Sequence, residues 1–164
     1  MRFINWVFKS FVMIKMVKIS VSSWSLHREL PFFLRKDVPG KISLLDFPKI
    51  CVEEFGVNAV ELCQMHFMSI EQKYIEKVKD SLDRSEVKVV NIPVDVGHAA
   101  EPDPEKRKAE FKIIKRWFHI AKYLGSPSIR VNTGDGGGEE ALQRAIDGYL
   151  SLIHISEPTR PLYI

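Results

Sequence analysis

Short apolar segments typical of β-strands alternate four times with longer amphipathic segments typical of α-helices. The expected strands span residues 17–24, 59–63, 88–97 and 128–132, and the expected helices span residues 46–56, 69–82, 103–125 and 138–149. Strands that alternate with helices pair in parallel through right-handed crossovers. Two α/β architectures meet this requirement, an open doubly wound sheet and a (βα)₈ barrel.

Capping residues indicate where the expected helices begin and end. Asp46 and Asp103 each precede a proline by one or two positions, as N-cap residues often do. Ser69 is predicted to cap the second helix. Gly56 and Gly125 follow the last apolar residues of their helices, where glycine commonly ends a helix in the left-handed conformation.

Polar side chains follow each of the four expected strands. They are Trp24, Ser25 and His27; Glu61, Gln64 and His66; Asp95 and His98; and Arg130 and Asn132. The carboxyl ends of parallel strands meet at one rim of a barrel or one edge of an open sheet. We therefore expect these side chains to share one site.

Charge and cysteine usage limit the classes of function. Residues 16–149 hold 20 basic and 20 acidic side chains, so this part of the chain is neutral. A nucleic-acid-binding protein would show a basic excess there, so no nucleic-acid partner is expected. Cys51 and Cys63 give neither a disulfide framework nor a metal-ligand spacing. No apolar run reaches the roughly 18 residues of a membrane span, and a cytoplasmic protein is expected.

The two ends of the chain differ from the rest. Residues 1–15 are apolar and basic without a cleavage site, so we interpret them as a mis-called leader before a natural start at Met16. An amphipathic membrane-surface arm is the alternative. Residues 150–164 begin with LSLIHISEPTR, which matches the translation of a common transposase-based sequencing adapter. We expect this tail to be an artefact, so that His154 has no functional role.

Three segments carry a resemblance to a known superfamily. AVELCQMHF, VVNIPVDVG and WFHIAKYLGSPSIRVNTG resemble the first half of xylose-isomerase-like TIM barrels, a superfamily of sugar-phosphate isomerases and epimerases that also contains apurinic-site endonucleases. The resemblance covers residues 16–149, whereas a complete barrel needs about 250 residues. It implies a (βα)₈ TIM barrel of which only the first four βα units are present. Such a fragment would be inactive, with apolar strand residues exposed, and would aggregate or dimerise.

The resemblance also implies a function for the full-length parent. The parent is expected to be a metal-dependent isomerase or epimerase that moves a proton on a sugar, sugar phosphate or related polyol. The divalent ion would be Mn²⁺, Mg²⁺, Co²⁺ or Zn²⁺, and its main ligands, carboxylates and histidine, are expected in the missing half. No metal ligand is assigned to this fragment, although His66 could bind a metal in endonuclease-like relatives. An endonuclease-like phosphodiesterase and a non-catalytic barrel that binds a small polyol are the alternatives.

The resemblance assigns roles to the polar residues at the strand ends. His66 and His98 are candidate catalytic residues, although each could be a loop histidine bound to the backbone. The candidate substrate-binding residues are Trp24, His27, Glu61, Asp95, Arg130 and Asn132. Arg130 could instead form a rim salt bridge, and Trp24 could pack under the rim. Asn132 stands where an endonuclease would place a glutamate ligand, which argues against a trinuclear zinc site.

Overall fold

The computed structural model describes residues 19–31, 40–134 and 136–156. The predicted leader at residues 1–15 and the end of the predicted tail, residues 157–164, lie outside the described residues. No described helix is long and apolar enough to cross a membrane.

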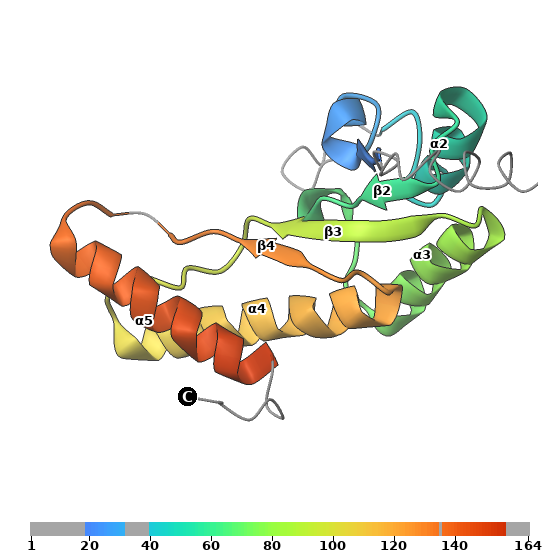
Figure 1. Cartoon of the computed structure of the whole chain (residues 1–164). Coiled ribbons are helices and arrows are strands. Elements are labelled where there is room, and N and C mark those ends of the chain that lie inside the picture. The colour runs from blue at the N-terminus through green and yellow to red at the C-terminus, as the bar shows by residue number, and fades with distance from the viewer. Residues whose placement is uncertain (1–18, 32–39, 135, 157–164) are drawn as a thin grey trace, which may run out of the picture.

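Four parallel strands form a sheet in which each strand neighbours the next one along the chain (Figure 1). They are β1 Val21–Ser22, β2 Ala59–Glu61, β3 Lys88–Val94 and β4 Ile129–Val131. The order β1-β2-β3-β4 continues in one direction. A doubly wound sheet reverses its order at a switch point, whereas the wall of a barrel does not. The sheet therefore has the topology of the first half of a TIM barrel, and the predicted fold class is confirmed.

A helix follows each strand. The helices are α2 Phe47–Phe55, α3 Gln72–Arg84, α4 Pro104–Leu124 and α5 Glu139–Ser156, with short 3₁₀ helices at Ser23–Leu26 and Gln64–His66. Figure 1 shows α3, α4 and α5 on one side of β3 and β4. The main core lies between the helices and this face of the sheet, and it includes Phe47, Val60, Ile75, Val78, Ile92, Val94 and Trp117. Burial of these apolar side chains is the main force that holds the layers together.

A β-bulge in β3 sets which side chains face away from the helices. Val60 pairs with Val89 and Glu61 pairs with Asn91, so Val90 is an extra residue. A bulge changes the face on which the following residues lie. Asn91 thereby lies beside Glu61, to which it donates a hydrogen bond.

The face of the sheet opposite the helices is polar. Each strand or its immediate flank contributes a polar side chain, and these are Ser22, Glu61, Asn91, Ser128 and Arg130. The expectation that apolar strand residues would be exposed is wrong for Val21, Ile129 and Val131, which are half-buried and pack against the two hydrophobic clusters. It holds for Ile19, which is 67% exposed.

The structure confirms some predicted helix ends and corrects others. The Asp103 carboxylate accepts hydrogen bonds from the amides of Glu105 and Lys106, so it caps α4 as predicted. Gly56 and Gly125 end α2 and α4 with φ angles of 63° and 78°. The Asp46 side chain does not cap α2.

Short-range polar contacts explain two of the corrections. The Asp46 carboxylate accepts instead from the Ser43 amide and hydroxyl, which form a turn before α2. The Ser69 hydroxyl accepts from the Glu71 amide, and α3 begins only at Gln72. In both cases a nearby backbone group binds the side chain before the helix begins.

Two elements differ in length from the prediction. The first strand ends at Ser22, whose hydroxyl accepts a hydrogen bond from the Trp24 amide and so caps a 3₁₀ helix. Helix α5 continues past Tyr149 to Ser156 because the apolar spacing continues and Leu152 is buried. Apolar residues at helical spacing fold in this way whatever their origin, so the interpretation of residues 150–164 as an artefact stays a prediction.

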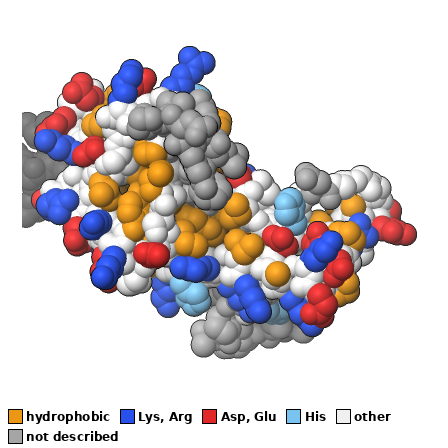
Figure 2. Space-filling model, turned by 180° about the vertical axis from the view of Figure 1, so that it is seen from behind, with side chains coloured by type: hydrophobic (Ala, Val, Ile, Leu, Met, Phe, Trp, Pro, Cys, Tyr) orange, Lys and Arg blue, Asp and Glu red, His pale blue; other side chains and the backbone are white. Residues whose placement is uncertain are grey.

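Charged side chains of both signs are distributed over the surface. On the face shown in Figure 2, Lys and Arg alternate with Asp and Glu around a central group of hydrophobic side chains. No single sign of charge dominates that face.

Candidate functional site

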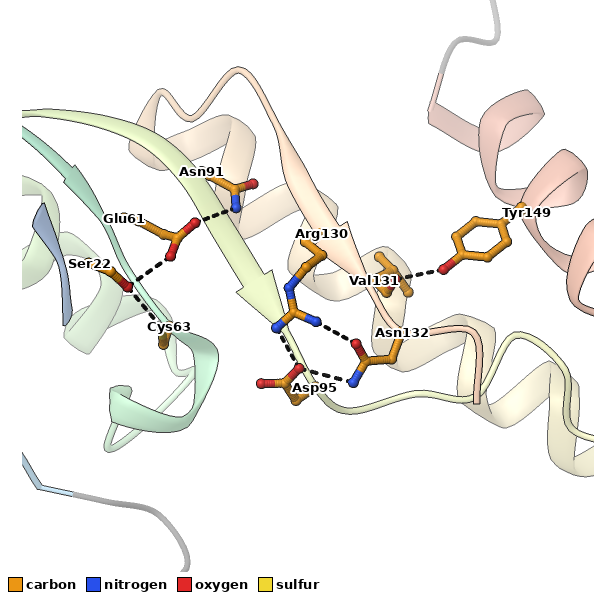
Figure 3. A network of polar contacts seen from close by, with 9 residues as sticks. All are labelled: Ser22, Glu61, Cys63, Asn91, Asp95, Arg130, Val131, Asn132 and Tyr149. Atoms are coloured by element: carbon orange, nitrogen blue, oxygen red, sulfur yellow. Dashed lines mark hydrogen bonds and ion pairs between the residues drawn. The ribbon is translucent and has the colours of Figure 1, made fainter. Parts of the chain in front are cut away.

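Glu61, at the carboxyl end of β2, is held in one orientation by its neighbours on β1 and β3. The Ser22 hydroxyl donates to Glu61 Oε1 over 2.8 Å, and the Asn91 amide nitrogen donates to Oε2 over 2.7 Å (Figure 3). Each oxygen of the carboxylate therefore accepts a hydrogen bond from a different strand. Such bonds fix the direction in which the remaining lone pairs can bind a ligand.

Ser128 continues this polar row to the strand on the other side of Asn91. Its hydroxyl oxygen lies 2.9 Å from the Val90 carbonyl and 3.1 Å from Asn91 Oδ1, and it donates to one of them at a time. The Val90 carbonyl belongs to the bulge, where the ladder is interrupted. Sequence reasoning missed Ser22, Asn91 and Ser128, although polar residues inside otherwise apolar strands were a usable signal.

A second cluster lies nearer the rim and joins β3 to β4. The Arg130 guanidinium donates to Asp95 Oδ1 over 2.7 Å, and the Asn132 amide nitrogen donates to the same oxygen over 3.0 Å. The guanidinium also donates to Asn132 Oδ1, which closes a triangle of three side chains (Figure 3). The structure thus brings three of the predicted substrate-binding residues together, and their role in binding stays a prediction.

Ser22 and Glu61 of the first cluster and Asp95 and Arg130 of the second line one open hollow of about 510 Å³. Pro93 and Trp24 supply apolar surface, and the charged lining consists of Glu61, Asp95 and Arg130. The lining of the hollow thus contains two carboxylates and one guanidinium. Its volume is within the range of small-molecule sites.

Trp24, which lines this hollow, lies near two histidine rings. Its ring stacks on His27 with centroids 4.8 Å apart and lies 6.3 Å from the His66 ring. The His27 Nδ1 atom is 3.0 Å from the Trp24 carbonyl oxygen, within the same 3₁₀ turn. Trp24 itself is 48% exposed.

Of these three rings, that of His66 is fully buried. Its Nδ1 atom lies 2.8 Å from the Ser23 hydroxyl, which also accepts a hydrogen bond from the Cys63 amide. Burial, together with the nearby charge of His27, lowers the pKa of His66 to about 4. The imidazole is therefore neutral near pH 7. A ring with no exposed surface contacts a substrate only after its neighbours move, and the acid–base role of His66 stays a prediction.

His98 lies apart from the hollow. It is exposed in the loop after β3, where its amide donates to the Glu110 carboxylate of α4. Its ring lies against Gly134, at which an added Cβ would be 3.2 Å from Nδ1. The structure thus brings Trp24, Glu61, Asp95 and Arg130 to one hollow but leaves His98 outside it.

The described residues do not form a metal site by themselves. Among them, no three His, Cys, Asp or Glu side chains lie close enough together to hold an ion. The Glu61 carboxylate accepts bonds from two side chains, and Asp95 is paired with Arg130. This donor set by itself does not fit a resident divalent ion.

The consecutive parallel sheet, its helices and the polar clusters at the strand ends define the chain as four βα units of a TIM barrel. Residues 51–159 match the family described as xylose isomerase-like TIM barrel. The chain belongs to this family.

Solved structures of similar fold are about twice as long as this chain. A D-psicose 3-epimerase, solved in the presence of D-fructose, has a TM-score of 0.63 at 9% identity, over 87% of this chain and 49% of its own. A protein of Sinorhizobium meliloti 1021 has a TM-score of 0.63 at 12% identity, over 85% and 46%. A xylose isomerase domain protein from Planctomyces limnophilus has a TM-score of 0.56 at 13% identity, over 85% and 50%. At these identities the similarity establishes the fold alone. No curated protein matches the chain.

Proposed function

We propose that the chain is the amino-terminal half of a sugar or sugar-phosphate isomerase or epimerase that uses a divalent metal ion. The observation that carries this proposal is the hollow at the strand ends, where an oriented carboxylate, a carboxylate–guanidinium pair and a tryptophan ring lie together. Sugar hydroxyls both donate and accept hydrogen bonds, so they suit Glu61, Asp95 and Arg130. The apolar face of a sugar ring suits Trp24.

The charge of the hollow favours a neutral polyol over a phosphate ester. Glu61 and Asp95 together outweigh Arg130, whose guanidinium binds Asp95. An anionic substrate would have to compete with Asp95 for the guanidinium and would be repelled by Glu61. The same argument disfavours the phosphodiesterase alternative, as does the neutral charge of residues 16–149.

Neither the metal ion nor an acid–base role of His66 rests on a contact with the hollow. Metal dependence, with Mn²⁺, Mg²⁺, Co²⁺ or Zn²⁺, rests on ligands beyond the described residues. His66 would act as an acid or base only if Trp24 and Ser23 moved to open its ring to the hollow. In that case His66→Ala in the parent would lower turnover by roughly a hundredfold.

The test uses the parent gene continued through the missing βα units. Purified parent protein is incubated with ketoses and aldoses, with and without EDTA, and product formation is followed by ¹H NMR. We expect turnover that EDTA abolishes, and a roughly hundredfold lower kcat/KM for Glu61→Gln. Glu54→Gln, which changes an exposed carboxylate on α2, is the matched control and should leave kcat/KM unchanged.

Three outcomes would contradict the proposal in different ways. Cleavage of DNA at abasic sites without sugar turnover would identify the phosphodiesterase alternative. Sugar binding by calorimetry without turnover would identify a binding protein. Equal effects of Glu61→Gln and Glu54→Gln on kcat/KM would show that the hollow takes no part in the reaction.

A further inference from the structure

Two side chains from different strands fix both oxygens of the Glu61 carboxylate. Ser22 lies on β1 and Asn91 lies on β3, the strands on either side of β2, so their donors approach the carboxylate from opposite sides (Figure 3). A carboxylate has about four lone-pair sites, and these two bonds use one site on each oxygen. Each oxygen therefore keeps a lone pair between the two donors, and Glu61 lines the hollow.

The two donors are themselves held by further hydrogen bonds. The Ser22 oxygen accepts from the Trp24 amide over 3.3 Å, and its own proton goes to Glu61. The Asn91 Oδ1 atom lies 3.1 Å from the Ser128 hydroxyl, which can donate to it. The opposite orientation of the Asn91 amide would place Oδ1 against a carboxylate oxygen, and two acceptors repel each other. Glu61 is therefore held in one orientation before any ligand binds.

The free side of this carboxylate suits a ligand that presents two donors side by side. A guanidinium binds a carboxylate in this bidentate way. Among the described residues that line the hollow, Arg130 carries the one guanidinium, and it donates to Asp95 and Asn132 instead of Glu61. A neutral polyol offers the same pattern with two adjacent hydroxyls, one for each carboxylate oxygen.

We infer that Glu61 recognises a pair of adjacent hydroxyls of a neutral polyol, and that Asn91 is a positioning residue that keeps the carboxylate turned toward this pair. Asn91 is not among the residues that line the hollow, so it acts through Glu61 and not on the ligand. The inference rests on the proposed function in taking the ligand to be a polyol, but it concerns binding and not the reaction.

The test measures the binding of D-glucitol to the parent protein by titration calorimetry. D-Glucitol has no carbonyl group and cannot be isomerised, so binding is measured apart from turnover. It is compared with the analogues that each lack one hydroxyl. We expect binding to weaken roughly tenfold or more for two analogues, whose missing hydroxyls are adjacent, because each loss leaves a charged acceptor without its donor. The other analogues should bind almost as tightly as D-glucitol.

Substitutions then separate recognition from folding. Glu61→Gln replaces one acceptor oxygen by a donor, so at least one of the two large losses should disappear. Asn91→Leu removes the donor to Oε2 and should make both losses severalfold smaller. Asn58→Leu, the same change at an exposed position just before β2, should not alter them. Ser22→Ala releases the other oxygen and should act as Asn91→Leu does, so it replaces that variant if circular dichroism shows it to be unfolded.

The outcomes distinguish this inference from the proposed function. Absence of D-glucitol binding, similar losses for all analogues, or the same two losses in Glu61→Gln would overturn the inference, even if the parent turns over a sugar. Release of a bound divalent ion by Glu61→Gln, with the hydroxyl dependence unchanged, would make Glu61 a metal ligand and would also overturn it. The expected pattern of binding without turnover of any sugar would support the inference and contradict the proposed function.

Discussion

At the scale of single residues, burial changes the chemistry of His66 most. The unfolded chain binds a proton at this imidazole with a pKa near 6.5, whereas the folded chain does so only at a pKa of about 4. Between these values the unfolded state binds more protons than the folded state. The contribution of neutral His66 to stability is therefore complete above about pH 6.5 and is lost as the pH falls toward 4.

We predict that the free energy of unfolding rises between pH 4 and pH 6.5 and that His66→Gln removes part of this rise. Glutamine can still bond Ser23 but does not titrate in this range. Denaturant unfolding followed by circular dichroism at several pH values measures the slope. NMR titration of the imidazole signal that disappears in His66→Gln gives the pKa itself. A midpoint near 6.5 would mean that the ring is hydrated rather than buried.

At the scale of elements, the crossing of α5 over the loop after β3 depends on a glycine. A Cβ at Gly148 would lie 2.4 Å from the Ala99 carbonyl oxygen. We predict that Gly148→Ala forces α5 away from this loop and lowers the free energy of unfolding by about 1–3 kcal/mol. Denaturant unfolding at fixed protein concentration provides the measurement.

Gly137 provides the matched control for this prediction. No atom lies within 4 Å of the position that its Cβ would take. Gly137→Ala should therefore leave stability within about 0.5 kcal/mol of the original chain. Similar losses from both substitutions would show that the close helix crossing is not the cause.

Alanine substitution of the two aspartates that were predicted to cap helices should have different effects. Hydrogen bonds from the amides of Lys106 and Glu105 lower the pKa of Asp103, so this cap weakens on acidification. We predict that Asp103→Ala accelerates hydrogen exchange of these two amides, whereas Asp46→Ala leaves the first turn of α2 unaffected. NMR-detected exchange distinguishes the amides. Equal acceleration in both helices would contradict the contacts described here.

At the scale of the whole molecule, the described residues form one wall of the candidate site. The hollow is lined by residues from β1 to β4 and the segments that follow them, and the solved barrels of similar fold are about twice as long. We predict that the purified 164-residue chain does not isomerise or epimerise a sugar, because the described residues form one wall of the hollow and, among them, no three potential ligands lie close enough together to hold an ion. Continuation of the gene through the missing units should restore turnover, measured by ¹H NMR. Turnover by the purified chain alone would contradict both the half-barrel interpretation and the expected position of the metal ligands.

The features of this fold that depend on local physics could be predicted from the sequence alone. The period of apolar residues distinguishes strands from helices, and the left-handed conformation required at Gly56 and Gly125 ends two helices. Asp103 caps its helix through bonds to residues two and three positions away. The alternation of elements then restricted the fold to parallel α/β architectures. These features require no knowledge of distant contacts.

Which polar groups meet, and which are buried, depends on contacts between residues that are far apart in the sequence. Asn91 reaches Glu61 across 30 residues of sequence because the bulge at Val90 changes the side-chain face. His66 and Ser23 are separated by 43 residues, and their contact places a histidine expected at the rim in the interior. Strand register and the packing of neighbouring units fix such contacts, and a shift of one residue would reverse the face of every side chain in a strand.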